Sequence, residues 1–116
     1  MRDFKQLSIW QRSHALTLKI YKHTQTYPKN ELFGLTSQMR RSASSIPTNI
    51  AEGSGRHSEA EMKHFLVIAR GSASELEYQL ILSHDLGYLN ETVFNGLTIE
   101  LNEVQKMIYT FIRNVK

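Results

Sequence analysis

Apolar residues recur at steps of three and four along most of the chain, and this spacing predicts amphipathic helices. The clearest stripe lies near the carboxyl end and consists of Val93, Leu97, Leu101, Val104, Ile108, Phe111 and Val115. Asn90 precedes this stripe and is the expected N-cap of its helix. No run alternates between apolar and polar positions as a half-buried strand would. We therefore expect an all-α protein.

The first predicted helix follows the stripe Ile9, Leu16, Ile20 and Tyr27. Ser8 and Gln11 have the spacing of a capping box, so Ser8 is the expected N-cap. Pro28 is expected to end this helix, because proline cannot supply a backbone donor. Trp10 is expected to anchor a core or an interface rather than to carry a cofactor.

A proline interrupts the stripe of the second predicted helix, which is expected to open at Asn30 or Glu31. The stripe is Leu32, Leu35, Met39, Ala43, Ile46 and Ile50. Pro47 removes one backbone donor, and its ring crowds the carbonyl of Ala43. Because the stripe resumes at Ile50, we expect a helix kinked at Pro47. Polar side chains are expected to satisfy the freed backbone groups; they are Ser44, Ser45, Thr48 and Asn49.

The third predicted helix begins with a capping box formed by Ser58 and Glu61 and ends at Gly87. Its stripe is Met62, Phe65, Ala69, Ala73, Leu76 and Leu80. Gly71 costs about 1 kcal/mol relative to alanine in a helix interior, so we expect another backbone to lie close to it. The expected neighbours are Ser44, Ser45 and Ala51. The alternative is a glycine tolerated on an exposed face.

These four helices and their short connections predict an antiparallel up-down-up-down four-helix bundle. The run Gly53–Gly55 is expected to end the second helix. A length of 116 residues indicates one domain over residues 1–116. The chain has no cysteine, which excludes disulfides and thiolate chemistry. Its first residues lack the apolar run of a secretory signal, and its longest strictly apolar run is too short to span a bilayer. We expect a cytoplasmic protein with no membrane partner.

Two motifs resemble those of a known family. Residues 45–53 read SIPTNIAEG and residues 68–77 read IARGSASELE. Both resemble signatures of the four-helix-bundle proteins that are encoded in 23S rRNA intervening sequences. The order of elements is similar from Leu7 to Phe111. The residues that carry the two motifs include Pro47, Asn49, Glu52, Gly53, Gly71 and Ser72.

The resemblance implies a four-helix bundle that assembles as a homo-oligomer, with a pentamer expected. Proteins similar to this one are encoded within rRNA intervening sequences, or act as accessory factors to retroelement reverse transcriptases. The resemblance therefore implies RNA or DNA as a partner, or else a reverse transcriptase or another protein.

Charge is uneven along the chain, whose formal net charge is +3. Residues 1–31 hold six Lys and Arg against two Asp and Glu, whereas residues 58–87 hold two against five. A basic half attracts acidic partners such as nucleic acid. The candidate phosphate-binding residues are Arg40, Arg41, Arg56, Lys19 and Lys22. We expect the three arginines to form one patch around the second helix and its glycine stop.

The alternative is that the basic and acidic segments neutralise each other, within the bundle or between subunits. In that scaffold interpretation, Arg40 and Arg41 pair with carboxylates of a neighbouring subunit. The candidate carboxylates are Glu75, Glu77 and Asp85.

Catalytic and metal chemistry is only weakly indicated. Glu61 and His64 have the spacing of a di-metal bundle site, but no second such pair exists. His57 joins them on one face, and a solvated polar face is the favoured interpretation of these three residues. Glu52 could serve as a catalytic acid or base, but an ion pair with Arg56, four residues later, is the favoured interpretation. No serine lies in a Gly-x-Ser-x-Gly elbow. We expect no enzyme, no cofactor and no metal.

Overall fold

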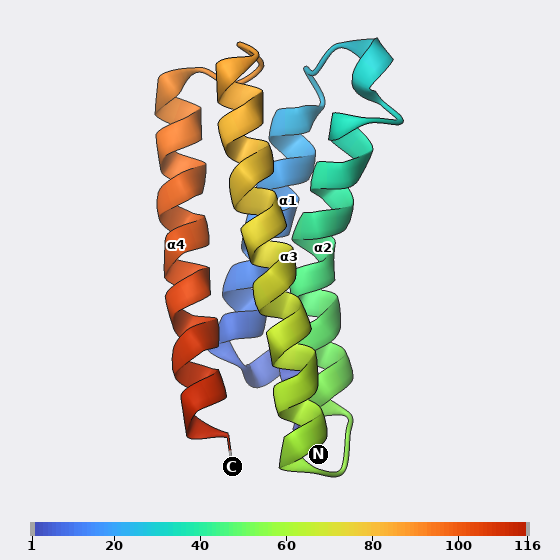
Figure 1. The fold of residues 1–116 in the computed structure, drawn as a ribbon, viewed down its shortest axis with the longest axis vertical. Coiled ribbons are helices and arrows are strands. Elements are labelled where there is room, and N and C mark those ends of the chain that lie inside the picture. Colours follow the sequence, from blue (N-terminus) through green and yellow to red (C-terminus); the bar gives the residue numbers. More distant parts are fainter. Residues whose placement is uncertain (1, 116) are drawn as a thin grey trace.

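The structure is a computed structural model that describes residues 2–115. Four helices make up the bundle: α1 (Ser8–Thr24), α2 (Leu35–Ser54), α3 (Glu59–Asp85) and α4 (Glu91–Asn114). Two short 3-10 helices, η1 (Phe4–Gln6) and η2 (Lys29–Glu31), precede α1 and α2. Consecutive helices run in opposite directions, and no strand occurs within the described range (Figure 1). The predicted all-α four-helix bundle is confirmed.

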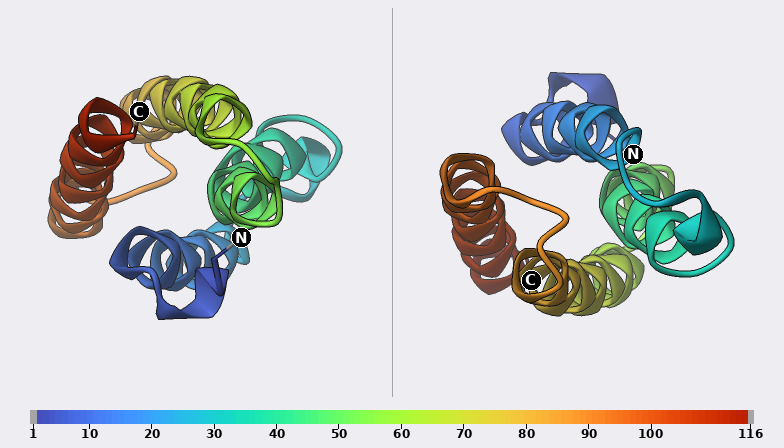
Figure 2. Two further views of the ribbon diagram at one scale, coloured as in Figure 1. Left: turned by 90° about the horizontal axis from the view of Figure 1, so that it is seen from below. Right: turned by 90° about the horizontal axis from the view of Figure 1, so that it is seen from above.

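Each helix packs against its two neighbours around the bundle, and α4 closes the ring onto α1 (Figure 2). The predicted stripes supply most of the core. Its most deeply buried large side chains are Leu16, Ile20, Met39, Ile46, Ile50, Met62, Leu66, Leu76, Leu80, Leu101, Val104 and Ile108. Leu66 is buried where the predicted stripe named only its neighbour Phe65, which is half-buried. Within residues 2–115, no helix combines the length and hydropathy needed to cross a membrane.

Most of the predicted helix ends are confirmed. Ser58 and Asn90 accept hydrogen bonds from the amides of Glu61 and Val93, so both are N-caps. Gly87 has a φ of +82°. The Gly87 amide donates to the carbonyl of His84, and the next amide donates to that of Ser83, which is a Schellman motif.

The predicted capping box of the first helix is wrong. Leu7 occupies the N-cap position and makes no side-chain capping bond, while Ser8 is already inside the helix. The η1 turn lies directly before α1, and Gln11 Nε2 reaches back to donate to the carbonyl of Lys5. The helix also ends at Thr24, four residues before Pro28. Tyr27 is nevertheless buried.

The second helix begins later than predicted. Residues 29–31 form η2, and α2 starts only at Leu35, after Gly34. Leu32 therefore lies in the turn and is half exposed rather than part of the core stripe. Glu31 holds the turn, because its Oε1 accepts from the amide of Leu35 at 3.3 Å.

Helix α2 continues through Pro47. The proline leaves the carbonyl of Ala43 without its amide donor, and a side chain of another helix donates to it instead. In a regular helix, the amide of residue 47 would donate to the carbonyl of Ala43. Here Thr17 Oγ1, on α1, lies 3.0 Å from the Ala43 oxygen and 2.8 Å from the carbonyl of Ser13. The Ser13 carbonyl also accepts a backbone amide within α1, whereas the Ala43 carbonyl has lost its amide donor to Pro47. We therefore assign the hydroxyl hydrogen of Thr17 to the Ala43 carbonyl. Continuity through Pro47 agrees with the sequence analysis, and the kink itself stays a prediction.

Gly53, not Gly71, is the glycine at which two helices come close. A Cβ on Gly53 would lie 2.9 Å from Met62 Sδ and 3.0 Å from Phe65 Cβ. A Cβ on Gly71 would meet nothing within 4 Å. The expectation that another backbone packs against Gly71 is therefore wrong within this chain, and the exposed-face alternative is correct. The neighbouring Ser72 makes the contact with α2 instead, because its hydroxyl lies 2.8 Å from that of Ser45.

Thr17→Val tests the bond that replaces the missing amide. It should lower the free energy of unfolding by about 1–3 kcal/mol, because it leaves a buried carbonyl without a donor. Pro47→Ala should fold with similar helicity and restore an amide at that position. In the Pro47→Ala background, Thr17→Val should cost less, with a coupling energy of about 0.5 kcal/mol or more in a double-mutant cycle measured by urea unfolding. Strictly additive effects would contradict this assignment.

Gly53→Ala tests the close approach of α2 and α3. It should destabilise the protein by about 1–3 kcal/mol, since the new methyl group overlaps Met62 and Phe65. Gly96→Ala is the matched control, because Gly96 is an exposed glycine inside α4 with nothing within 4 Å of its Cβ position. That control should gain up to about 1 kcal/mol from helix propensity. Equal responses in thermal and urea melts would refute the assignment.

Candidate nucleic-acid interface

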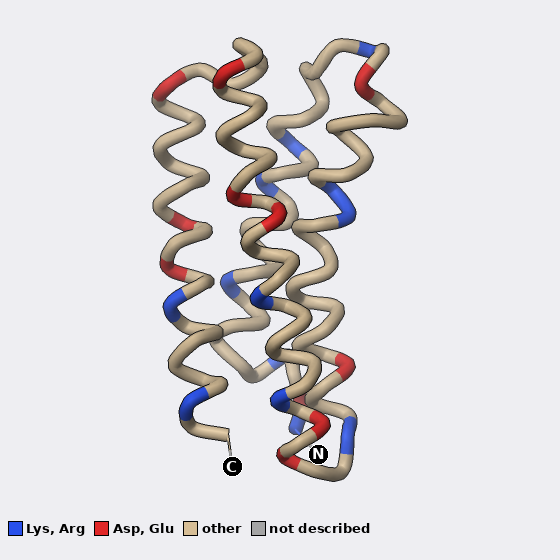
Figure 3. Tube along the Cα trace, in the orientation of Figure 1, with Lys and Arg blue, Asp and Glu red and all other residues tan. Residues whose placement is uncertain are grey.

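The five basic residues proposed from the sequence lie in three separate places. Arg40 and Arg41 lie in the first half of α2, whereas Arg56 follows its end. Figure 3 shows that Lys and Arg residues are spread along the length of the bundle. At about 1.5 Å of rise per residue, Arg40 is about 21 Å along the helix axis from Ser54. The expectation of a single arginine patch is therefore wrong, because most of the length of α2 separates Arg40 and Arg41 from Arg56.

Arg56 is neutralised within the chain. Its guanidinium pairs with the Glu52 carboxylate one turn earlier, as the sequence suggested, and lies 4.9 Å from the centre of the Phe65 ring. An exposed pair of this kind contributes little stability, but it cancels the charge that a phosphate would need.

The two candidate lysines of α1 line a groove between α1 and α4. Lys19 Nζ forms an ion pair with Glu100 Oε1 at 2.7 Å. Lys22 lines the same groove, next to Lys19 and Glu100. Arg12 also pairs with α4, through Glu103 at 3.1 Å. The basic first helix is thus balanced mainly by α4, and the idea of neutralisation within the bundle is partly correct.

Arg40 and Arg41 differ in their surroundings although they are adjacent. Arg40 is half-buried: its Nε donates to Thr24 Oγ1 at 3.0 Å, and its Nη2 donates to the carbonyl of Tyr21 at 3.3 Å. Its guanidinium also lies 4.8 Å from the centre of the Tyr21 ring. Arg41 is exposed, and within residues 2–115 it has no carboxylate at ion-pair distance. Arg40 therefore joins α1 to α2, and Arg41 presents its charge to solvent.

A groove of about 500 Å³ runs beside these two arginines. Its lining is Tyr21, Leu32, Phe33, Thr36, Ser37, Arg40, Arg41 and Ser44. Phe33 is 94% exposed, more than any other large apolar side chain in the described range. The sequence analysis missed Phe33; the signal was an aromatic residue outside every stripe, directly before Gly34.

The turn that carries Phe33 is fixed to the rest of the bundle by Glu31. Oε2 of Glu31 accepts from the hydroxyl of Tyr88, in the α3–α4 loop, at 2.9 Å. This hydrogen bond to a carboxylate raises the pKa of Tyr88 above its usual value. The amide of Gly34 donates to the Glu31 carbonyl at 3.0 Å. Glu31 therefore accepts three hydrogen bonds, which join the turn to the α3–α4 loop, to the start of α2 and to Gly34.

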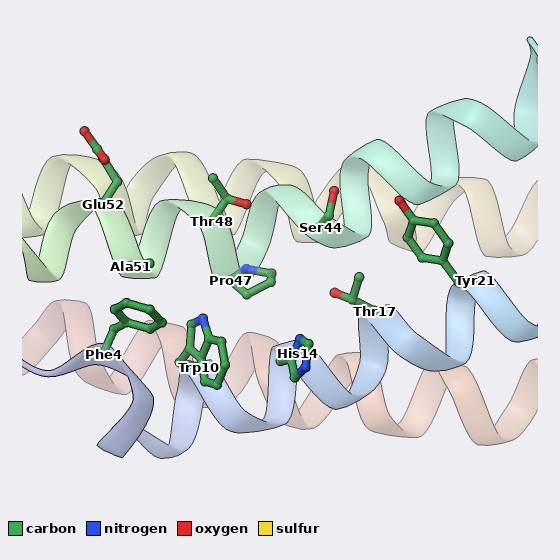
Figure 4. Close-up of a pocket in the computed structure, with 10 residues that line it drawn as sticks. All are labelled: Phe4, Trp10, His14, Thr17, Tyr21, Ser44, Pro47, Thr48, Ala51 and Glu52. Carbon is green, nitrogen blue, oxygen red and sulfur yellow. The ribbon is translucent and has the colours of Figure 1, made fainter.

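A larger groove of about 710 Å³ lies between α1 and α2 at Pro47. Figure 4 shows Phe4, Trp10 and His14 along one side of it, facing Pro47 and Ala51 across the groove. Trp10 is partly buried against the core and stacks on His14 with ring centres 4.9 Å apart. This agrees with its expected role as an anchor at the edge of the core.

The two sequence motifs meet between α2 and α3. Asn49 Nδ2 donates to the carbonyl of Ser45 at 2.8 Å and to its hydroxyl at 2.9 Å. That hydroxyl is the one that contacts Ser72. Asn49 and Ser72 are therefore structural residues, which lock the middle of α2 to the middle of α3 away from the arginine groove.

Within residues 2–115, no three histidine or carboxylate side chains gather closely enough to hold a metal ion. Glu61 instead serves the N-terminus of α3, where the Ser58 hydroxyl donates to its Oε1 at 3.1 Å. His64 lies edge-on to the ring of Phe65. The polar residues at this end of α3 are explained by capping and packing.

Comparison with known proteins places the fold. A crystal structure at 1.70 Å of a protein of unknown function from the S23 ribosomal protein family of Bacteroides thetaiotaomicron VPI-5482 superposes with a TM-score of 0.84. It is 24% identical to this chain, and the match covers 91% of this chain and 96% of that protein. A search of curated proteins found no match. A family model described as 23S rRNA-intervening sequence protein matches residues 5–110. The chain is therefore a member of the 23S rRNA-intervening sequence protein family.

Proposed function

We propose that this chain is a non-enzymatic, homo-oligomeric protein that binds nucleic acid through the groove beside Arg40 and Arg41. The observation that carries the proposal is the position of Arg41, an exposed guanidinium without a carboxylate partner in the described range. Guanidinium groups have a fork of donors that suits phosphate oxygens. The family's description refers to 23S rRNA, which favours RNA as the first nucleic acid to test.

The charges around this groove support the same proposal. Glu31, the nearest acidic residue along the chain, uses its carboxylate to accept from Tyr88 and from the amide of Leu35. Arg40 adds a second positive charge, even though its hydrogen bonds and its ring contact hold it against α1. The binding would be mostly electrostatic, and therefore weakly selective for sequence and sensitive to salt.

Self-association is supported by apolar residues on the outer face of α3. Val67, Tyr78 and Ile81 are 42%, 62% and 44% exposed. They are separated by eleven and three residues, which places them on one side of the helix. Large exposed apolar side chains that share one side of a helix are candidates for a protein–protein contact. We propose this face as the contact between copies, with five copies expected per ring. A ring would repeat the arginine groove and raise the avidity for a long polyanion.

Arg41→Gln tests the nucleic-acid proposal. The variant should keep the oligomer mass and bind duplexes of all sequences more weakly. The slope of log affinity against log salt should shrink by about 0.9 for each phosphate that the variant no longer neutralises. Arg113→Gln, at the far end of α4, removes the same charge and is the matched control. Wild-type protein that shows no salt-dependent binding at about 0.1 M salt, where the screening length is about 10 Å, would refute the proposal.

A Tyr78→Glu, Ile81→Glu double variant tests the contact between copies. Wild-type protein should have about five times the 13.4 kDa mass of one chain by light scattering. The variant should dissociate toward single chains, because burial of each large apolar side chain contributes about 1.5–3 kcal/mol and a buried carboxylate opposes it. Ile99→Glu, at an exposed position of α4, should leave the mass unchanged. A wild-type protein that remains a single chain would contradict the ring.

If the oligomer forms but binds neither RNA nor DNA, the protein is a scaffold, and the groove arginines serve a protein partner. That outcome is the alternative function considered from the sequence. It is distinguished by the same two measurements, namely mass and salt-dependent affinity.

A further inference from the structure

We propose that the arginine groove selects unpaired over double-stranded nucleic acid, with the ring of Phe33 stacking on an exposed base. This inference rests on the proposed function and specifies its ligand. It starts from the exposure of Phe33, whose side chain is 94% accessible and lines the same groove as Arg41. Because almost all of its surface is accessible, the phenyl ring is open to a flat partner.

The backbone of the turn that carries this ring is held in place by hydrogen bonds. The turn is closed by the amide of Gly34 donating to the Glu31 carbonyl, and Glu31 is in turn bonded to Tyr88 and to the start of α2. A Cβ on Gly34 would lie only 3.0 Å from Glu31 Oε1, so the turn is tightly packed against that side chain. A preorganised backbone lowers the entropy cost of binding, which favours the use of a residue on this turn as a contact surface.

The composition of the groove matches that of single-strand binding sites, which combine positive charge along the backbone path with aromatic rings for the bases. Arg41 supplies an uncompensated charge, and Tyr21 with Arg40 supplies a stacked aromatic–guanidinium pair 4.8 Å apart. In a duplex, the faces of the bases are already stacked on each other and cannot reach Phe33. In a single strand, they are free to stack on an exposed ring.

The test compares wild-type protein and Phe33 variants on four probes: oligouridylate, oligothymidylate, an abasic strand of the same length, and a duplex of the same length. Wild-type protein should bind the two base-containing strands about 5- to 150-fold more tightly than the abasic strand, which has the same phosphates but no rings. The ratio of uridylate to thymidylate affinity identifies RNA or DNA as the preferred source of the unpaired base, and either preference supports the proposal.

Phe33→Ala and Phe33→Leu should both lose the preference for base-containing strands, since leucine keeps an apolar side chain but not an aromatic face. Phe33→Trp should keep the preference, and its added fluorescence should be quenched by the base-containing strands but not by the abasic strand. Ile99→Trp places a tryptophan at an exposed site on α4 and should show no such quenching. Thermal melts should be unchanged in every Phe33 variant, because the side chain is almost fully exposed.

Three results would overturn the inference. Equal wild-type affinity for abasic and base-containing strands would remove the stacking role and leave phosphate binding by Arg41 intact. Absence of binding to all four probes would overturn both this inference and the proposed function. A fall in oligomer mass on Phe33→Ala would show that the ring contacts a second copy of the chain instead of a base.

Discussion

The contact between Thr17 and the carbonyl of Ala43 is the interaction on which the arrangement of α1 and α2 depends. A buried carbonyl without a donor is costly, and Pro47 creates one in the middle of a 20-residue helix. The chain meets this cost with a hydroxyl from a neighbouring helix, 26 residues earlier in the sequence. The contact fixes which turn of α1 lies opposite which turn of α2. It therefore bears on both grooves beside these helices, because Tyr21 of α1 and Ser44 of α2 line each of them.

The core of this bundle was predictable because burial imposes a period on the sequence. Leu101 and Ile108 are buried for the same reason that they recur with helical spacing. The turn before α2 was less predictable, since Leu32 continues the spacing by chance although the chain there forms a 3-10 turn. Gly71 shows a related limit. Its sequence position indicates a cost to the helix, but whether another backbone is near depends on the packing of all four helices.

Charge was harder to interpret from the sequence than hydrophobicity. The cluster of arginines in residues 40–56 is close in sequence, but helical geometry separates Arg40 from Arg56 along the axis of α2. The partners of the basic residues lie far away in the chain, as Lys19 and Glu100 do, so linear segments cannot reveal which charges are cancelled. Phe33 was missed because stripes identify the residues that face the core, whereas a binding surface is built from residues that do not.

The seam between α1 and α4 has a consequence for the motions of the bundle. It joins the two helices that lie farthest apart in the chain. Its ion pairs are exposed at Arg12–Glu103 and partly exposed at Lys19–Glu100, so dissolved salt weakens them. The contacts between α2 and α3 do not depend on charge. Gly53 packs against Met62, and the hydroxyls of Ser45 and Ser72 are hydrogen-bonded. Local opening should therefore begin at the α1–α4 seam and become more frequent as ionic strength rises, while α2 and α3 stay paired and retain slow amide exchange.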